Sequence, residues 1–192
     1  ANGDHLSALF TSMFLHGGWM HLAGNMLFLW IFGDNIEDEL GHVMYLIFYL
    51  ACGVAAGLFQ VLSAPASNVP MVGASGAIAG VMGAYLLLFP KAKVDILLFI
   101  IIMIRIIPVP AWIMLMLWFG MQFLGGLGAD PDAGGVAYWA HAGGFVAGIL
   151  LTLPFWIGRG GMAFWQRTEG HPPHPPANYP ILESRIPRIK RK

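Results

Sequence analysis

The sequence contains few charged residues. Lys, Arg, Asp and Glu make up 10% of its 192 residues, whereas hydrophobic residues make up 57%. A soluble domain usually carries about 25% charged residues, so this chain has too few polar groups to cover a globular surface in water. Its ten basic and ten acidic residues cancel, which argues against nucleic acid as a partner. The composition favours a polytopic membrane protein whose surroundings are the lipid bilayer.

Cysteine is almost absent as well. Cys52 is the single cysteine and lies in an apolar run, so no intramolecular disulfide can form. The histidines and this cysteine do not show the spacing of zinc ligands. No lysine follows the glycines at the spacing of a phosphate-binding loop. We therefore expect neither a metal ion nor an organic cofactor.

Long apolar runs make up most of the chain. A helix that spans a bilayer needs about 20 mostly apolar residues. We expect an all-α bundle of five transmembrane helices, over residues 19–36, 42–62, 74–89, 108–127 and 138–157.

Three other segments differ from these runs. Residues 94–107 are apolar but short, β-branched and followed by prolines, so we expect an interfacial or extended segment rather than a sixth crossing. Residues 1–18 are expected to belong to a loop on the outer side. Residues 159–192 end in a Pro-rich, basic stretch and are expected to form a disordered tail.

The basic residues indicate an orientation in the membrane. They follow the third and fifth predicted spans, and none lies in segments 1–18, 63–73 or 128–137. The positive-inside rule then places the C-terminus in the cytoplasm and these three segments on the outer side. Five spans also place the N-terminus outside.

Four polar residues within the predicted spans are candidates for function, because polar side chains are costly in lipid. Ser75, His21, Asn25 and His141 all lie near the outer ends of their spans. The third span has only about 15 residues before Pro90, or roughly 22 Å of helix, against a hydrocarbon core of about 30 Å. Ser75 is therefore expected below the outer surface.

These residue types suggest nucleophilic catalysis. A serine hydroxyl attacks poorly unless a base removes its proton, and histidine is the usual base. His141 can reach Ser75 if their helices pack closely, and each helix has small residues four positions apart for such packing. These pairs are Gly76 with Gly80 and Gly144 with Gly148.

An oxyanion intermediate needs hydrogen-bond donors aimed at it. The first N–H groups of the helix that begins at Ser75 lack intrahelical acceptors and carry partial positive charge. His21 and Asn25 are four residues apart and lie on one helix face, from which their side chains can add N–H donors.

Three motifs in this order resemble the rhomboid family of intramembrane serine proteases. They are "HGGWMHLAGNM", "GASG", which begins at Gly73, and "AHAGG". The resemblance implies a protease domain over about residues 19–158 that cuts transmembrane proteins. It implies Ser75 as nucleophile, His141 as general base, and His21, Asn25 and the Ser75 amide as the oxyanion hole. Glu37 and Gly41 resemble a structural Glu-x-x-x-Gly motif of the family. The family core has six helices, so we expect its first helix to be absent from this sequence.

One departure concerns the surroundings of the base. Many relatives carry a tyrosine that stacks on the base four residues after the nucleophile, where this chain has Ala79. We expect another ring, from Tyr85, Tyr138 or Trp139, to take its place. The resemblance requires only a Ser–His dyad, so Asp130 and Asp132 are interpreted as charges of an outer loop rather than as a third catalytic member.

Several alternatives remain at this point. Ser75 alone could be a helix N-cap, and His141 alone a buried structural histidine. A noncatalytic rhomboid-like protein would bind membrane proteins without cutting them.

The bulky fourth span, which contains Trp118 and Phe119, is the predicted lateral gate for substrates.

Overall fold

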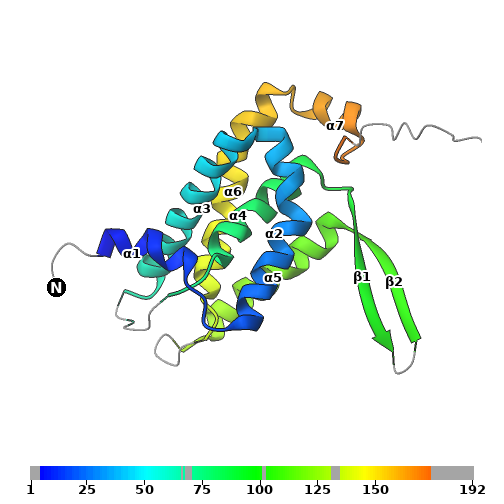
Figure 1. The fold of residues 1–192 in the computed structure, drawn as a ribbon. Coiled ribbons are helices and arrows are strands. Elements are labelled where there is room, and N and C mark those ends of the chain that lie inside the picture. The colour runs from blue at the N-terminus through cyan, green and yellow to red at the C-terminus, as the bar shows by residue number, and fades with distance from the viewer. Residues whose placement is uncertain (1–4, 66, 68–70, 101–102, 131–134, 174–192) are drawn as a thin grey trace, which may run out of the picture.

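The computed structural model describes residues 5–65, 67, 71–100, 103–130 and 135–173. These residues form a helical bundle from which one β-hairpin protrudes (Figure 1). The elements are α1 (His5–Thr11), the 3-10 helix η1 (Ser12–Phe14), α2 (Trp19–Leu40), α3 (His42–Ser63), α4 (Ser75–Leu88), β1 (Lys93–Ile100), β2 (Met103–Pro110), α5 (Ala111–Gly128), α6 (Tyr138–Gly158) and α7 (Met162–Thr168).

The short helix α4 lies at the centre of the bundle. Eleven of its 14 residues are buried, and α2, α3, α5 and α6 all contact it. A helix that is apolar on every side is stable only when other helices surround it or lipid does. At 1.5 Å per residue α4 is about 21 Å long, so it is shorter than the hydrocarbon core of a bilayer.

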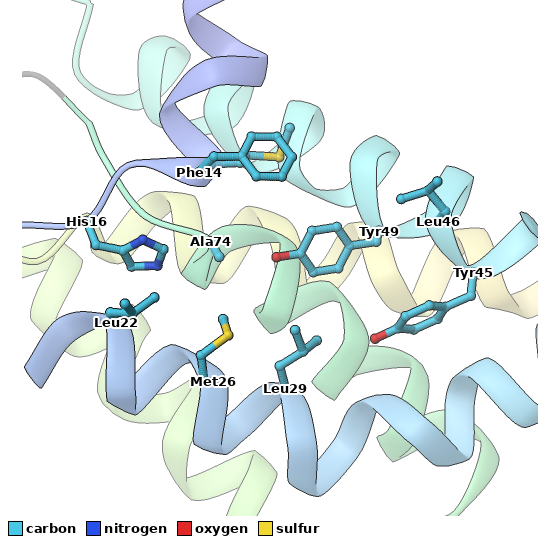
Figure 2. A pocket seen from close by; sticks show the side chains of 10 residues that line it. Phe14, His16, Leu22, Met26, Leu29, Tyr45, Leu46, Tyr49 and Ala74 are labelled. Carbon is cyan, nitrogen blue, oxygen red and sulfur yellow. The ribbon is translucent and has the colours of Figure 1, made fainter. Parts of the chain in front are cut away.

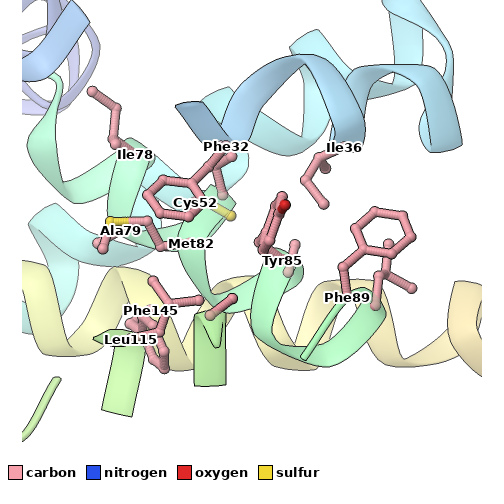
Figure 3. Close-up of a cluster of buried hydrophobic side chains, with 14 of the residues drawn as sticks. Phe32, Ile36, Cys52, Ile78, Ala79, Met82, Tyr85, Phe89, Leu115 and Phe145 are labelled. Carbon is pink, nitrogen blue, oxygen red and sulfur yellow. The ribbon is translucent and has the colours of Figure 1, made fainter. Parts of the chain in front are cut away.

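The core around the C-terminal half of α4 is aromatic. Phe32 of α2 packs edge-to-face on Tyr85 of α4 with ring centroids 5.0 Å apart, and Tyr85 packs in the same way on Phe89. Figure 3 shows these rings beside Met82 and Phe145, with side chains from α2, α3, α4, α5 and α6 meeting in one cluster.

The predicted helices are present, with boundaries that differ by a few residues from those expected. Among the described residues, α3, α5 and α6 are long and apolar enough to cross a membrane, and α4 is a shorter apolar helix. Helix α2 has 22 residues, but His21, Asn25 and the acidic residues near its end make it more polar. The structure is that of an all-α membrane bundle.

The segment after α4 is an antiparallel hairpin. Its two strands pair from Lys93 opposite Pro110 to Ile100 opposite Met103. The amide of Ala111 donates a 2.7 Å hydrogen bond to the carbonyl of Ala92, so the base of the hairpin is closed against the start of α5. The extended conformation expected for residues 94–107 is therefore present in the described part of this segment.

The expectation of a disordered tail from residue 159 is wrong for residues 159–173. Helix α7 forms there, Phe164 is buried, and the Trp165 indole N–H donates to the carbonyl of Leu87 at 2.9 Å. Arg159 also forms an ion pair with Glu39. The two aromatic side chains precede the Pro-rich stretch and anchor this segment to the bundle. Residues 174–192 lie outside the described residues.

The N-terminal segment is partly helical and packs on the bundle. Helix α1 contacts α3, and Met13 of η1 is buried. The amide of Gly73 donates a 2.9 Å hydrogen bond to the carbonyl of Ser12, which ties this segment to the loop before Ser75. Residues 5–14 therefore help to position the start of α4.

Candidate active site

Ser75 is the first residue of α4, and the loop before it is held in a conformation that favours glycine. Gly73 has a φ of +121°, which residues with a side chain rarely adopt. A Cβ atom added there would lie 2.9 Å from His21 Nε2 and 3.6 Å from Ser75 Oγ. Glycine at this position therefore lets the backbone pass between His21 and the serine.

His141 lies in the first turn of α6 and reaches across to the start of α4. Its Nε2 is 2.7 Å from Ser75 Oγ, within hydrogen-bond distance. The approach of the two helices depends on glycine. A Cβ atom at Gly144 would overlap the carbonyl oxygen of Gly76, and one at Gly148 would overlap that of Gly80. Two backbones in contact thus set the distance between the hydroxyl and the imidazole.

The other side of the His141 ring contacts α5, which was not anticipated. His141 Nδ1 is 2.8 Å from the amide oxygen Oε1 of the buried Gln122. The Trp118 ring lies 5.8 Å from the imidazole, at an interplanar angle of 35°. Trp118 is therefore the ring beside His141, and the expectation of Tyr85, Tyr138 or Trp139 in this place is wrong.

Those three aromatic residues have other contacts. Tyr85 packs on Phe32 and Phe89, Trp139 packs on Phe59 and Phe123, and Tyr138 lies against Gly125. The spacing of Trp118 and Gln122, four residues apart on one helix face, is the sequence signal that could have indicated a shared contact.

His21 of α2 lies beside Gly73, in the loop that leads to Ser75. The backbone N–H of Gly17 donates to His21 Nδ1 at 3.3 Å. A neutral imidazole that accepts at Nδ1 carries its proton on Nε2. His21 therefore presents an Nε2–H donor on the side that faces Gly73 and Ser75.

Asn25 lies one turn further along α2 and is 7% exposed. Within the described part of the chain, its amide nitrogen Nδ2 is buried and has no hydrogen-bond partner. Buried side-chain amides are nearly always paired, because an unpaired one costs about 1–3 kcal/mol. This donor belongs to a residue that lines the same cavity as Ser75 and His21, so it is suited to an acceptor that arrives with a ligand.

A cavity of about 1330 Å³ connects these side chains. Ser75, His141, His21, Asn25, Gln60 and Trp118 all line it. Gln60 of α3 also accepts a 3.0 Å hydrogen bond from the amide of Ala140, so it holds the start of α6 beside the cavity. The cavity is large enough to hold water beside the serine.

Glu37 and Gly41 lie at the end of α2 that is far from Ser75. The amide of Gly41 donates to the carbonyl of Glu37, and Gly41 has a φ of +77° at the junction with α3. The Glu37 carboxylate contacts His42 Nδ1 at 2.7 Å. These residues form the turn between two helices and do not reach the catalytic candidates.

A second cavity of about 470 Å³ lies between α2 and α3 (Figure 2). Its lining is mostly apolar, with the rings of Tyr45 and Tyr49 between the two helices. His16 lies at its edge, with its ring 5.3 Å from that of His21. Ser75 and His141 are not among its lining residues, so we do not assign the chemistry to it.

The two ring nitrogens of His141 contact Ser75 and Gln122 rather than an aspartate. Asp130 lines the large cavity, but the Nδ1 of His141 is bound by Gln122. Asp132 lies outside the described residues. No group of three or more possible metal ligands occurs among the residues that the structure describes.

Comparison with known proteins gives a consistent result. The family model described as Rhomboid domain matches residues 3–157. Rhomboid protein 1, mitochondrial, of Saccharomyces cerevisiae is 35% identical over 149 residues, which cover 74% of this chain and 40% of that protein. RHOMBOID-like protein 4 of Arabidopsis thaliana is 35% identical over 157 residues, which cover 78% of this chain and 34% of that protein.

A similarity to a protein named as a protease is shorter. Rhomboid protease GluP of Bacillus subtilis is 41% identical over 78 residues, which cover 41% of this chain and 15% of that protein. The chain spans less than half the length of each of these three relatives.

Proposed function

The chain belongs to the rhomboid family, and from this premise we propose that it is an intramembrane serine endopeptidase. It is an integral membrane protein, and its proposed substrates are membrane proteins cut in or next to a transmembrane segment. The observation that carries the proposal is the 2.7 Å contact between His141 Nε2 and Ser75 Oγ inside a cavity within the bundle. A serine beside a histidine base is the arrangement needed for acyl transfer.

The proposed reaction has two steps. His141 Nε2 takes the proton of Ser75 as Oγ attacks the peptide carbonyl carbon, and the imidazolium then protonates the leaving amine. Water then enters the cavity and attacks the acyl carbon as it loses a proton to His141, and His141 returns this proton to Ser75 Oγ as the acyl–oxygen bond breaks. The substrate helix must unwind locally, because its own hydrogen bonds shield the peptide bond that is attacked.

The oxyanion of each tetrahedral intermediate forms on the side of Ser75 that faces α2. The Ser75 amide, the Nε2–H of His21 and the Nδ2 of Asn25 are the proposed donors. The unpaired, buried Nδ2 supports this role, because the oxyanion would give it the acceptor that it lacks. In this proposal the donors are fixed before the charge develops, which is how such sites lower the barrier.

The proposed orientation places the C-terminus in the cytoplasm and opens the cavity to the outer side. The distribution of basic residues supports it, since none lies in the predicted outer segments. A cut in the outer third of a substrate's span would follow from this orientation. Mapping the products of a substrate of known orientation by mass spectrometry tests it, and a cut in the cytoplasmic half would contradict it.

A serine-directed fluorophosphonate probe tests the chemistry. Wild-type protein should be labelled at Ser75 and should cleave a single-span substrate, whereas Ser75→Ala and His141→Ala should do neither at a measurable rate. Ser7→Ala, in α1, is the matched control and should keep both activities. Undiminished cleavage by Ser75→Ala would refute the assignment. A folded wild-type protein that binds membrane proteins but resists the probe would be noncatalytic.

The donor role of Asn25 has a separate test. Loss of one oxyanion donor typically lowers the rate about 10²- to 10³-fold. Asn25→Ala should therefore cleave slowly and still be labelled by the probe at a reduced rate. Measured kcat equal to that of the wild type would exclude Asn25 as a major donor.

A further inference from the structure

Gln122 is a buried polar residue that the catalytic proposal does not use. It lies in α5, a helix whose neighbouring side chains are turned outward, with Met121 53% and Leu124 70% exposed. Gln122 itself is 8% exposed, and its Oε1 lies 2.8 Å from His141 Nδ1. A polar side chain within an apolar spanning helix is costly and commonly functional.

We propose that Gln122 is a positioning residue that fixes the tautomer and orientation of His141. This inference rests on the proposed function, in which His141 is the general base. It adds a third member, on a third helix, to a pair of residues supplied by α4 and α6.

The argument begins with the two nitrogens of the imidazole. A carbonyl oxygen such as Gln122 Oε1 can only accept a hydrogen bond, so Nδ1 must carry the proton in this contact. A neutral imidazole protonated at Nδ1 has its lone pair on Nε2, the atom that faces Ser75 Oγ at 2.7 Å. Gln122 therefore selects the tautomer that can accept the serine proton.

Without the Gln122 oxygen, nothing favours the tautomer of His141 that is protonated at Nδ1. The tautomer protonated at Nε2 cannot take a proton from Ser75, and the ring can rotate away from the hydroxyl. A buried Nδ1–H without a partner would also carry a desolvation cost, which favours other ring positions. The carboxylate of a Ser-His-Asp triad orients its histidine in the same way. Here a neutral amide takes that place, so the low-dielectric interior need not hold a further charge.

The position of Gln122 also links the base to the docking of α5. Trp118 lies one turn before Gln122 and contacts the same imidazole. Two residues of α5 thus contact His141: Gln122 at Nδ1 and Trp118 beside the ring. The other nitrogen, Nε2, faces Ser75 of α4. Both contacts come from one face of α5, so the base keeps its orientation as long as Trp118 and Gln122 stay docked on it.

The experiment compares three variants in α5 of the full chain. Gln122→Leu removes the acceptor, Gln122→Glu retains an oxygen at the same place, and Leu124→Ala is the control on the exposed face. We expect Gln122→Leu to lower kcat about 10- to 100-fold with little change in KM, the range seen when the hydrogen-bond partner that orients a metal-bound histidine is lost. Gln122→Glu should recover most of that loss, and Leu124→Ala should match the wild type.

A spectroscopic measurement separates positioning from packing. In ¹⁵N-histidine-labelled protein, the His141 signal is identified by its loss in His141→Ala. The wild-type signal should show a protonated Nδ1 and an unprotonated Nε2, and Gln122→Leu should shift the population toward the other tautomer. A purely structural role for Gln122 would lower the unfolding temperature without changing this signal in the folded protein.

The outcomes distinguish the two proposals. A wild-type protein without probe labelling or cleavage contradicts the proposed function. An active wild type with an equally active Gln122→Leu variant overturns the positioning role alone. Equal loss of kcat in Gln122→Leu and Gln122→Glu, with the tautomer unchanged, also overturns it.

Discussion

The two faces of α6 pack against their neighbours in opposite ways. Toward α4, glycines let the two backbones touch, with Gly144 against Gly76 and Gly148 against Gly80. Toward α5, the contact is made by rings: Phe119 stacks on Phe145 with centroids 4.9 Å apart, and Trp118 lies 6.0 Å from the same ring. Helix α6 thus contacts α4 through its backbone and α5 through its side chains.

This difference assigns two tasks to two interfaces: one fixes the distance between Ser75 and His141, and the other can open to a substrate. Backbones in contact have no rotamers to change, so the interface of α4 and α6 holds Ser75 and His141 at a fixed distance. Large side chains can change rotamer and let a helix tilt, and α5 also exposes much of its surface, with Leu117 64% and Leu127 65% exposed. We infer that a substrate enters beside α5, while the nucleophile and base remain together.

The largest effect is expected from placing a side chain in the backbone contact. In Gly148→Ala the new methyl group overlaps the carbonyl oxygen of Gly80, so α4 and α6 must separate. Overpacking of this kind usually costs about 1–3 kcal/mol. We expect a lower unfolding temperature in detergent and the loss of nearly all cleavage and probe labelling, because Ser75 and His141 move apart.

Gly120→Ala in α5 is the matched control for this prediction. A Cβ atom at Gly120 would meet no other group within 4 Å. Alanine is favoured over glycine within a helix by about 0.5–1 kcal/mol, so this variant should be as stable as the wild type or slightly more stable. Similar losses in Gly148→Ala and Gly120→Ala would show that the loss does not arise from the backbone contact between α4 and α6.

A smaller effect on cleavage is expected from the ring contact between α5 and α6. Loss of Trp118 and loss of Phe119 should change the rate in different directions. Trp118→Ala removes the ring beside His141 and should lower kcat, by about tenfold, within the range seen when a supporting contact of a functional histidine is lost. Phe119→Ala loosens α5 without touching His141 and should retain or raise the cleavage of transmembrane substrates. Single-turnover cleavage and probe labelling measure both. A rise in rate with Trp118→Ala would show that loosening α5 outweighs its support of the base.

This prediction differs from the one that the sequence alone suggests. From sequence, Trp118 and Phe119 look equivalent, since both are large side chains in the predicted gate. The structure distinguishes them because Trp118 contacts both His141 and Phe145, whereas the ring contact of Phe119 is with Phe145. An apolar helix gives little indication of which face turns inward, and Gln122 was missed for the same reason.

The parts that could be predicted from sequence share a physical cause. Polar residues are rare in spanning helices, so Ser75 and His141 stood out, and the structure places them within hydrogen-bond distance. Glycines at four-residue spacing indicated close helix packing. Helix α7 was missed because the prolines and basic residues that follow it dominate the composition, although Phe164 and Trp165 supply an anchor.

The aromatic core between the cavity and the other end of α4 bears on how well the membrane insulates against ion flow. Met82 lines the cavity and is 1% exposed, and beyond it along α4 lie Tyr85 and Phe89, which pack with Phe32. A charged ion that crosses an apolar layer of this kind must leave its hydration shell, which costs many kilocalories per mole. In the proposed reaction a bond within the bilayer would therefore be hydrolysed while salt ions stay on their own sides, and the potential across the membrane would be preserved during each turnover.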